Sequence, residues 1–254
     1  MLLRSVTRHV RQQNWTAICI DLVIVVVGVF IGIQVSNWND ERVSRVSELI
    51  FVESVRDDIA LAIRDGQGFI EMLSIVRDHG HRSLELIDSD ALCRVSCWAR
   101  LVDFFIASQW IDVRTNQAVF EEIKRSGLPR DLKLKATLTR YYGSTEQITI
   151  IGEQLPRYRE LVRSIIPANV QVQMWADCID ISGRQQIMIP DCPSPISKFD
   201  VVEIIDLLRA NSEVKPALTF WMSTISVIIV GLEEQHENGQ KVINEIDEYL
   251  AARN

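Results

Sequence analysis

A run of 19 residues, Ala17 to Val35, is the feature that most constrains what this chain can fold into. Its only strongly polar members are Asp21 and Gln34. As an α-helix the run would be roughly 28 Å long, close to the thickness of the hydrocarbon core of a bilayer. Trp15 and Trp38 lie just outside its two ends, where aromatic rings favour the headgroup region. The run therefore predicts a transmembrane helix.

The two flanks of this run differ in charge. Residues 1–14 contain Arg4, Arg8 and Arg11 and no acid, whereas the segment after Trp38 mixes both signs. Because cytoplasmic flanks carry an excess of basic residues, this asymmetry predicts a cytoplasmic N-terminus. The predicted divisions are a cytoplasmic tail over residues 1–14, a transmembrane helix over 15–38, and a domain over 39–254 that faces the periplasm or the cell exterior.

A cleaved signal peptide is the alternative interpretation of the N-terminus. The arginine-rich start and the apolar stretch Leu22–Ile33 also fit the two parts of such a peptide. No small-x-small cleavage site follows, since the next residues are IQVSNWND. The sequence therefore favours an uncleaved anchor.

One face of the predicted transmembrane helix carries small and polar residues. Gly28 and Gly32 form a G-x-x-x-G pair, which lets two helices approach closely, and Asp21 costs free energy wherever it meets lipid. We therefore expect this face to contact a membrane-protein partner or a second copy of the chain. The alternative is an isolated acid near the headgroups and glycines without a role. At intervals of three and four, the residues of this stripe are Asp21, Val25, Gly28, Gly32 and Ser36.

Cysteine usage agrees with a non-cytoplasmic domain. Cys19 lies in the apolar run, and the even number that remains suits an oxidising compartment. Sequence order favours the disulfides Cys93–Cys97 and Cys178–Cys192, although four cysteines allow three pairings. A four-cysteine zinc site and unpaired buried thiols are the alternatives.

The domain after Trp38 reads as almost wholly helical, because apolar residues recur at intervals of three and four. The first helix is expected to continue out of the membrane until Gly66 and Gly68 interrupt it. The later predicted helices are a stretch from Phe69 to Ile87, one around Trp98–Phe105, a short one capped by Thr115 or Asn116, a long one over 130–166, one over 200–210, and a final one from about Pro216.

Residues 168–199 differ from this pattern. The stretch VQVQMWADCIDISGRQQIMI alternates, contains β-branched residues and carries SGR as a turn, so it predicts a small β-hairpin tied by Cys178–Cys192. The predicted fold is mainly α: one N-terminal transmembrane helix that continues into a helical-bundle ectodomain with a small disulfide-tied β-hairpin insertion.

The last predicted helix raises a second membrane question. ALTFWMSTISVIIVGL spans 16 residues, which is short for a crossing, and it contains four serine or threonine residues. An acidic EEQHE follows without a cationic flank. A buried helix of the bundle is the favoured interpretation.

Charge is distributed unevenly along the domain. Between Lys124 and Arg163 there are nine basic residues against four acids, and the C-terminal helix is acidic. Antiparallel packing of the two helices with paired charges is the favoured explanation, and a surface for an anion or an acidic partner is the alternative. The net charge of −7 makes nucleic acid an unsuitable partner.

The sequence contains no motif that indicates catalysis. A glycine-rich phosphate loop, a nucleophile elbow and an HExxH motif are absent. The HGH sequence at 79–81, with Asp78 and Glu85, is a weak candidate for metal ligands, and a solvated helix end is favoured. We therefore expect no catalytic, cofactor-binding or metal-binding residues and no enzymatic activity.

Two stretches carry a resemblance to a known family. Residues Ile33, Val35, Asn37, Trp38 and Asn39 match an I-x-I-x-(I/V)-x-N-W-N box at the end of a transmembrane helix. The chain here resembles bacterial single-pass membrane proteins known only as a domain of unknown function. A later pattern of that family is matched by Phe120, Ile123, Ser126, Gly127, Leu138, Tyr141 and Tyr142. The resemblance implies an inner-membrane anchor, a helical periplasmic domain and an interfacial box of Asn37, Trp38 and Asn39, but no activity.

The favoured function is that of a periplasmic interaction or scaffold protein anchored in the bacterial inner membrane. It would associate through the transmembrane stripe and the helical ectodomain. The alternative is a sensor-like domain that binds a ligand of unidentified chemistry and transmits the change through the first helix. The short predicted cytoplasmic tail, without an output domain, disfavours independent signalling.

Overall fold

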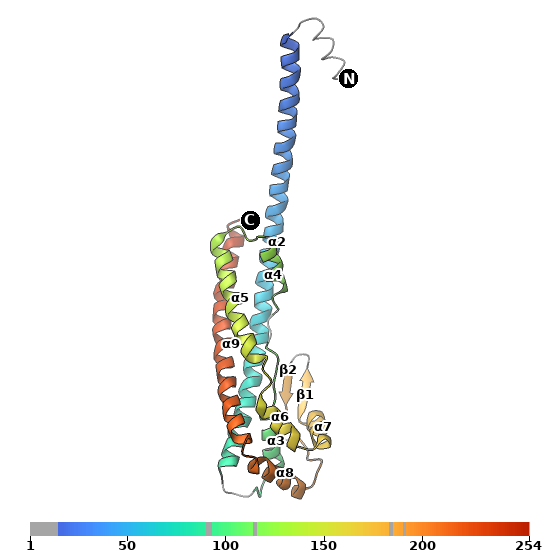
Figure 1. The fold of residues 1–254 in the computed structure, drawn as a ribbon, viewed down its shortest axis with the longest axis vertical. Coiled ribbons are helices and arrows are strands. Elements are labelled where there is room, and N and C mark those ends of the chain that lie inside the picture. The colour runs from blue at the N-terminus through green and yellow to red at the C-terminus, as the bar shows by residue number, and fades with distance from the viewer. Residues whose placement is uncertain (1–14, 90–92, 114–115, 183–184, 190–191, 254) are drawn as a thin grey trace. The chain divides into compact units, whose positions relative to one another are not determined.

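The computed structural model describes residues 15–89, 93–113, 116–182, 185–189 and 192–253. Most of these residues are helical, which confirms the predicted mainly α fold (Figure 1). The chain divides into two compact units, Met1–Val52 and Glu53–Asn254. In chain order the elements are α2 (Trp15–Asp88), α3 (Cys97–Ala107), α4 (Ala118–Arg125), α5 (Leu132–Gly152), α6 (Arg157–Ile165), α7 (Ala168–Asp177), β1 (Ile179–Ser182), β2 (Gln185–Met188), α8 (Lys198–Ala210) and α9 (Val214–Ala251).

Helix α2 does not stop at the glycines where the sequence predicted an interruption. It passes through Gly66 and Gly68 and ends at Asp88. Each glycine costs a helix about 1 kcal/mol relative to alanine. The apolar stripe of α2 continues beyond them, with Phe69, Leu73 and others buried in the core of the second unit. Burial of that stripe outweighs the weak helix propensity of the glycines.

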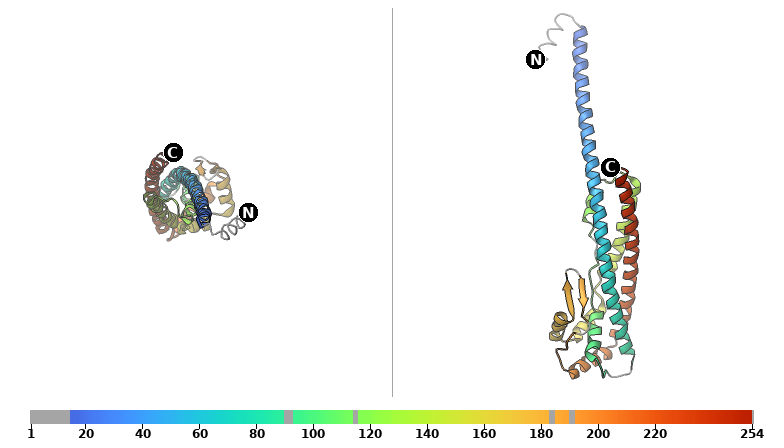
Figure 2. Two further views of the ribbon diagram at one scale, coloured as in Figure 1. Left: turned by 90° about the horizontal axis from the view of Figure 1, so that it is seen from above. Right: turned by 180° about the vertical axis from the view of Figure 1, so that it is seen from behind.

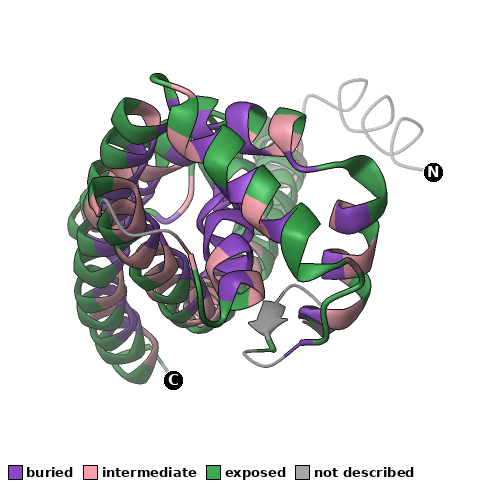
Figure 3. Cartoon of the chain, turned by 90° about the horizontal axis from the view of Figure 1, so that it is seen from below, coloured by how far each residue is buried: buried purple, intermediate pink, exposed green. Residues whose placement is uncertain are grey.

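The core of the second unit is formed by one face of each of several helices. Figure 3 shows the buried residues on the helix faces that turn toward one another and the exposed residues on the outer faces. Helix α3 lies deepest, because most of its residues are buried. Its fully buried side chains include Leu101, Phe104, Phe105 and Ile106.

Helices α5 and α9 pack side by side and run antiparallel, as the sequence predicted (Figure 2). Near the start of α5, the Thr137 hydroxyl donates to the carboxylate of Glu245, which lies near the end of α9, over 3.1 Å. Further along α5, Ile148 lies close to Gly231 in the first half of α9, since a Cβ added to Gly231 would lie 3.0 Å from the Ile148 side chain. The opposite order of the contacts along the two helices fixes the antiparallel direction.

The single helix predicted over 130–166 is two helices in the structure. Helix α5 ends at Gly152 and α6 begins after Pro156, which occupies the N-cap position of α6. A residue before proline avoids the helical conformation, and proline lacks an N–H. Leu155, which the sequence placed in the apolar stripe, is exposed instead.

The predicted β-hairpin is present, but it is shorter than the alternating stretch. Its strands β1 and β2 are antiparallel, with Ile179 opposite Met188, and part of the predicted SGR turn lies outside the described residues. Residues 168–177 form helix α7 instead of a strand. Val170 and Met174, four residues apart, are buried, whereas Val172 between them is 67% exposed. Burial therefore follows the helical period and not the period of two.

Candidate functional site

The N-terminal part of α2 exposes apolar side chains around its whole circumference. The consecutive residues Leu22, Val23 and Ile24 point to different sides of the helix, and each is more than half exposed. The most apolar 18-residue window of this helix has a mean hydropathy of 2.7, and none of it is buried. A helix that is apolar on every side requires a nonpolar environment around it. By length and composition this part of α2 is a candidate membrane span.

The five predicted stripe residues, Asp21, Val25, Gly28, Gly32 and Ser36, all lie within α2 and on one side of it. An added Cβ at Gly28 or Gly32 would meet no described atom within 4 Å. The structure therefore brings the stripe together as an open helix surface. Whether a second helix covers the surface stays a prediction.

The predicted interfacial box, Asn37, Trp38 and Asn39, is also helical and lies within α2. Its tryptophan is 66% exposed, as is typical of a ring that is not part of a protein core. The helix continues through the box without a break, so the box does not terminate the apolar helix in the structure.

Helix α9 is the second described helix that is long and apolar enough to cross a membrane. Its most apolar window has a mean hydropathy of only 1.5, and 39% of that window is buried. Leu218, Trp221, Ile225 and Ile229 lie in the core of the second unit. The indole N–H of Trp221 donates to the carbonyl of Ala107 over 3.0 Å. These contacts support the interpretation of α9 as a helix of the bundle.

Both predicted disulfides are present, Cys93–Cys97 and Cys178–Cys192. Cys19 is a free and exposed thiol in the apolar helix. The indole N–H of Trp98 donates to the carbonyl of Cys192 over 2.9 Å, so the two bridged segments are also joined by a hydrogen bond. The alternatives of a zinc site and of unpaired thiols at these four cysteines are therefore wrong.

A buried ionic network replaces the metal site considered for the HGH sequence. The carboxylate of Asp103, on α3, lies 2.7 Å from Nδ1 of His79 and 2.9 Å from Nε of Arg82, both on α2. Arg100 lies 3.5 Å from the other carboxylate oxygen. Burial alone would raise the pKa of Asp103, but the hydrogen bonds from His79 and Arg82 outweigh it and hold the pKa below its ordinary value. Among the residues that the structure describes, no three His, Cys, Asp or Glu side chains are placed to hold a metal ion.

Two arginines of the basic segment cap the end of α3. The Arg159 guanidinium donates to the carbonyl of Ser108 over 2.8 Å. Arg163 donates to Oγ of Ser108 over 2.9 Å, and its guanidinium carbon lies 3.5 Å from the centre of the Phe105 ring. Burial lowers the pKa of Arg163 to about 9, with a smaller contribution from Arg159. Cations at a helix C-terminus stabilise the last carbonyl groups, so these side chains have a structural role.

Among the described residues, two ion pairs join the basic segment to the region of the C-terminal helix. Arg157, the first residue of α6, lies 3.2 Å from Glu213, the N-cap residue of α9, so this pair has the expected signs. At the start of α5 the signs are reversed. The acid, Asp131, is the N-cap residue of α5, and it lies 3.8 Å from the base, Arg253, which follows α9. The antiparallel packing of α5 on α9 is confirmed by the contacts between the two helices.

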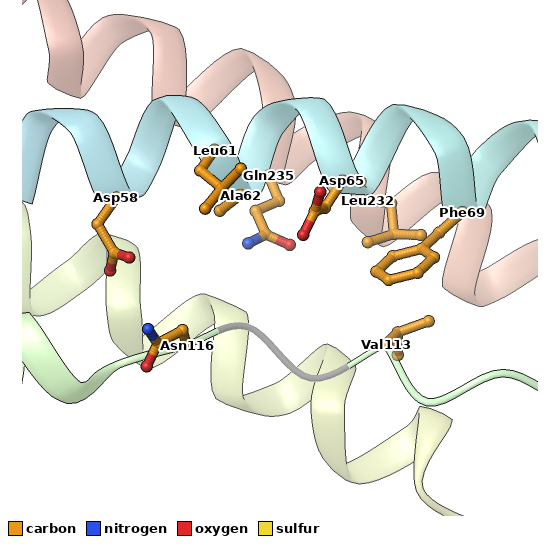
Figure 4. A pocket seen from close by; sticks show the side chains of 10 residues that line it. Asp58, Leu61, Ala62, Asp65, Phe69, Val113, Asn116, Leu232 and Gln235 are labelled. Carbon is orange, nitrogen blue, oxygen red and sulfur yellow. The ribbon is translucent and has the colours of Figure 1, made fainter. Parts of the chain in front are cut away.

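A cavity of about 140 Å³ lies within the second unit, between α2, α9 and the segment before α4 (Figure 4). Figure 4 shows the carboxyl groups of Asp58 and Asp65 and the amide of Gln235 projecting into the same space, with Phe69 facing Val113 at one end. The side chains of one face of α2 thus form one wall. The described residues that line the cavity are Asp58, Leu61, Ala62, Asp65, Gly66, Phe69, Val113, Asn116, Leu232 and Gln235.

The polar groups of the cavity are held by contacts behind it. The Tyr142 hydroxyl donates to Oδ2 of Asp58 over 3.4 Å. The Gln235 amide nitrogen donates to Oγ1 of Thr145 over 3.2 Å, and Asn116 accepts from the backbone N–H of Ala118. Burial raises the pKa of Asp58, and the hydrogen bond from Tyr142 reduces this effect. The cavity is therefore a pre-formed site with fixed acceptor groups.

Sequence reasoning missed both the Asp103 network and the cavity. Asp103 interrupts the apolar sequence LVDFFIA in α3, and a charged residue inside a buried helix is a signal of a partner elsewhere. Asp58 and Asp65 are two turns apart and on the same face of α2 as Leu61 and Phe69. Acids within an apolar helix face were thus the pattern in the sequence that could have indicated the cavity.

The chain gives no match in comparisons with protein families, curated proteins and solved structures. The resemblance based on the N-W-N box therefore stays a prediction.

Proposed function

We propose that this protein is anchored in the bacterial inner membrane by residues 15–38 of α2, with its N-terminus in the cytoplasm and the second unit in the periplasm. The exposed apolar surface of α2 is the main support. The arginines of residues 1–14 and the two disulfides support the direction, because basic flanks stay in the cytoplasm and disulfides persist outside it.

The anchor also associates with another transmembrane helix, so the protein serves as an interaction or scaffold protein. The single observation that carries this part is the open stripe with Gly28 and Gly32 at its centre and Asp21 in line with them. A close helix pair would cover the glycines by van der Waals packing. It would also remove Asp21 from lipid, where an acid costs up to a few kcal/mol.

Cysteine crosslinking in native membranes tests the association. In a Cys19→Ser background, Ser36→Cys places a thiol on the stripe, and Gln34→Cys places one on the opposite side of the same helix. We expect oxidative crosslinking at position 36, to a second copy or to another membrane protein, at a yield several-fold above that at position 34.

A substitution at the glycine pair provides the second arm of this experiment. Gly28→Leu adds a large side chain at the proposed contact, and Val23→Leu adds a methylene on the opposite face. We expect Gly28→Leu to reduce the crosslinking yield at position 36 and Val23→Leu to leave it unchanged. Equal yields at positions 34 and 36, together with no effect of Gly28→Leu, would contradict the association.

The cavity of the second unit favours a second candidate function, that of a ligand-binding sensor-like domain. One wall of the cavity is formed by α2, the same helix that includes the proposed anchor. A ligand that binds one arrangement of α2, α9 and the segment before α4 more tightly than another would shift the balance between them. Hydrogen exchange of the second unit, with and without ligand, would detect such a shift in α2.

A further inference from the structure

The two disulfides of the second unit lie in different surroundings. Cys178 and Cys192 are 0% and 6% exposed, and both belong to the core. Cys97 is also buried, but its partner Cys93 is only partly buried. The three residues between Cys93 and Cys97 are exposed, and Val95 is 81% exposed. Thiol–disulfide exchange begins when a thiolate attacks one sulfur of a disulfide, so access decides which bridge reacts. Of the four bridged cysteines, Cys93 is the most open to such an attack.

The Cys93–Cys97 bridge contributes less to the fold than the buried bridge does. Its sequence separation is 4, against 14 for the other bridge, and stabilisation grows with the length of the closed loop in the chain-entropy model. Hydrogen bonds also hold the bridged segment. Nζ of Lys198 donates to the carbonyl of Arg94 over 2.6 Å. The backbone N–H of Arg100 donates to the carbonyl of Ser96 over 3.2 Å. These contacts and the buried face of α3 do not depend on the bridge, so we expect the fold to persist when it is reduced.

Cys97 is placed to leave as a thiolate. It is the first residue of α3, where the N–H groups of the first turn lack partners within the helix and favour a negative charge. The side chain of the N-cap residue, Ser96, does not cap these groups. Arg94 adds a positive charge within the bridged segment. Burial alone disfavours a charged sulfur, and hydrogen bonds from the first-turn N–H groups to the thiolate would counter this cost.

We propose that Cys93–Cys97 is a thiol–disulfide exchange site that oxidises a dithiol, namely a reduced cysteine pair of another protein. A thiolate of the dithiol attacks Sγ of Cys93, the S–S bond breaks, and Cys97 leaves as a thiolate and takes up a proton. The second thiolate of the dithiol then attacks the mixed disulfide and releases Cys93. The dithiol loses two electrons and two protons and becomes a disulfide, while Cys93 and Cys97 gain them and become thiols. This activity goes beyond the proposed association and sensor functions and rests on neither.

Reduction of the purified, oxidised full-length chain by dithiothreitol, a small dithiol, tests the proposal. Samples taken over time are quenched with acid, alkylated with N-ethylmaleimide after denaturation, and analysed by peptide mass spectrometry. We expect Cys93 and Cys97 to become alkylated together, at a rate at least about tenfold above that of the buried bridge in the same molecules. Cys19, which is a free thiol, is the control for complete alkylation. The helical circular dichroism signal should stay unchanged while Cys93–Cys97 is reduced.

Glutathione, a monothiol, tests the order of attack in the unmodified chain. Because glutathione has no second thiol, its first attack leaves a mixed disulfide on one cysteine and a free thiol on the other. Early in the reaction we expect glutathione on Cys93 and N-ethylmaleimide on Cys97, at least about tenfold more often than the reverse.

Two single variants repeat this test from the other direction. In a Cys19→Ser background, Cys97→Ser leaves Cys93 as a partly buried free thiol, and Cys93→Ser leaves Cys97 as a buried one. With oxidised glutathione, we expect Cys97→Ser to form a mixed disulfide at least about tenfold faster than Cys93→Ser. The experiments on the unmodified chain decide the question even if a variant does not fold.

Three results would overturn the proposal. The first is equal rates of reduction for the two bridges. The second is glutathione found equally on Cys93 and Cys97, or mainly on Cys97. The third is loss of the helical signal at the same rate as reduction of Cys93–Cys97, because the bridge would then be a structural one.

Discussion

Asp103 is 5% exposed, and its carboxylate lies among His79, Arg82 and Arg100. Removing one partner from a buried ionic cluster leaves the other charges without compensation. We expect Asp103→Asn to lower the free energy of unfolding by about 2 kcal/mol, below the usual cost of breaking a fully buried pair because both arginines are partly exposed. Denaturant unfolding followed by circular dichroism would measure this.

The effect of Asp103→Asn also depends on pH. Folding lowers the pKa of Asp103, so the carboxylate stabilises the fold above its ordinary pKa of about 3.9. That contribution is lost as the pH falls through the lower pKa of the folded state. The difference in stability between the two proteins should therefore shrink below about pH 4. A difference that stays constant from pH 7 to pH 3 would contradict the assigned role of Asp103.

Two glycines in helices should respond to alanine in opposite directions. At Gly80, on α2, an added Cβ would overlap with Sδ of Met222 on α9, whereas at Gly143, on α5, it would meet no described atom within 4 Å. Gly80→Ala should destabilise the protein by about 1–3 kcal/mol through overpacking. Gly143→Ala should stabilise it by up to about 1 kcal/mol through helix propensity. Thermal unfolding of both variants checks this, and stabilisation by Gly80→Ala would contradict the close approach of α2 and α9.

At the scale of elements, periodicity predicted most helices because each buries one apolar face. The short α4 follows from a pattern that is local in the sequence, whereas the antiparallel packing of α5 on α9 joins segments that are far apart in it. The boundaries that were wrong depend on competition between local and tertiary effects. Helix α2 continues through Gly66 because its apolar stripe is buried. By contrast, the helix predicted over 130–166 is interrupted at Pro156, although the apolar pattern continues past it.

The α7 segment illustrates a different limit. Val170, Val172 and Met174 fit either a strand or a helix, because a short apolar pattern does not distinguish the two periods. Only the burial of positions 170 and 174, with position 172 exposed, identifies the helix. The cavity was harder still to predict from the sequence, because its lining combines Asp58, Asn116 and Gln235 from three separate segments.

The Cys178–Cys192 disulfide should stabilise α7 and the hairpin. The two cysteines are 14 residues apart, and a loop of this length is worth about 3 kcal/mol in the chain-entropy model. The double variant Cys178→Ser and Cys192→Ser should lower the free energy of unfolding by about 2–4 kcal/mol. Because Cys178 is fully buried beside the core, loss of the whole second unit would also be visible as loss of helical signal. An unchanged stability would contradict a role of this bridge in the fold.

At the scale of the whole molecule, the sequence is most informative about the environment of the N-terminal helix. Length, composition and flanking charges predicted a span over residues 15–38 without knowledge of any contact, and the structure has an exposed apolar helix there. The ionic network and the cavity depend on contacts between distant segments, so they became visible only in the folded second unit.

Single-cysteine accessibility tests the membrane arrangement most directly. In a Cys19→Ser background, a membrane-impermeant maleimide is applied to intact spheroplasts of cells that express Ser5→Cys, Phe199→Cys or Ala251→Cys. Phe199 is 78% exposed in the second unit, and Ala251 ends α9. We expect labelling at positions 199 and 251 in intact spheroplasts and at position 5 only after lysis. Labelling at position 5 with protection of 199 would reverse the orientation, and labelling at only one of 199 and 251 would make α9 a second span.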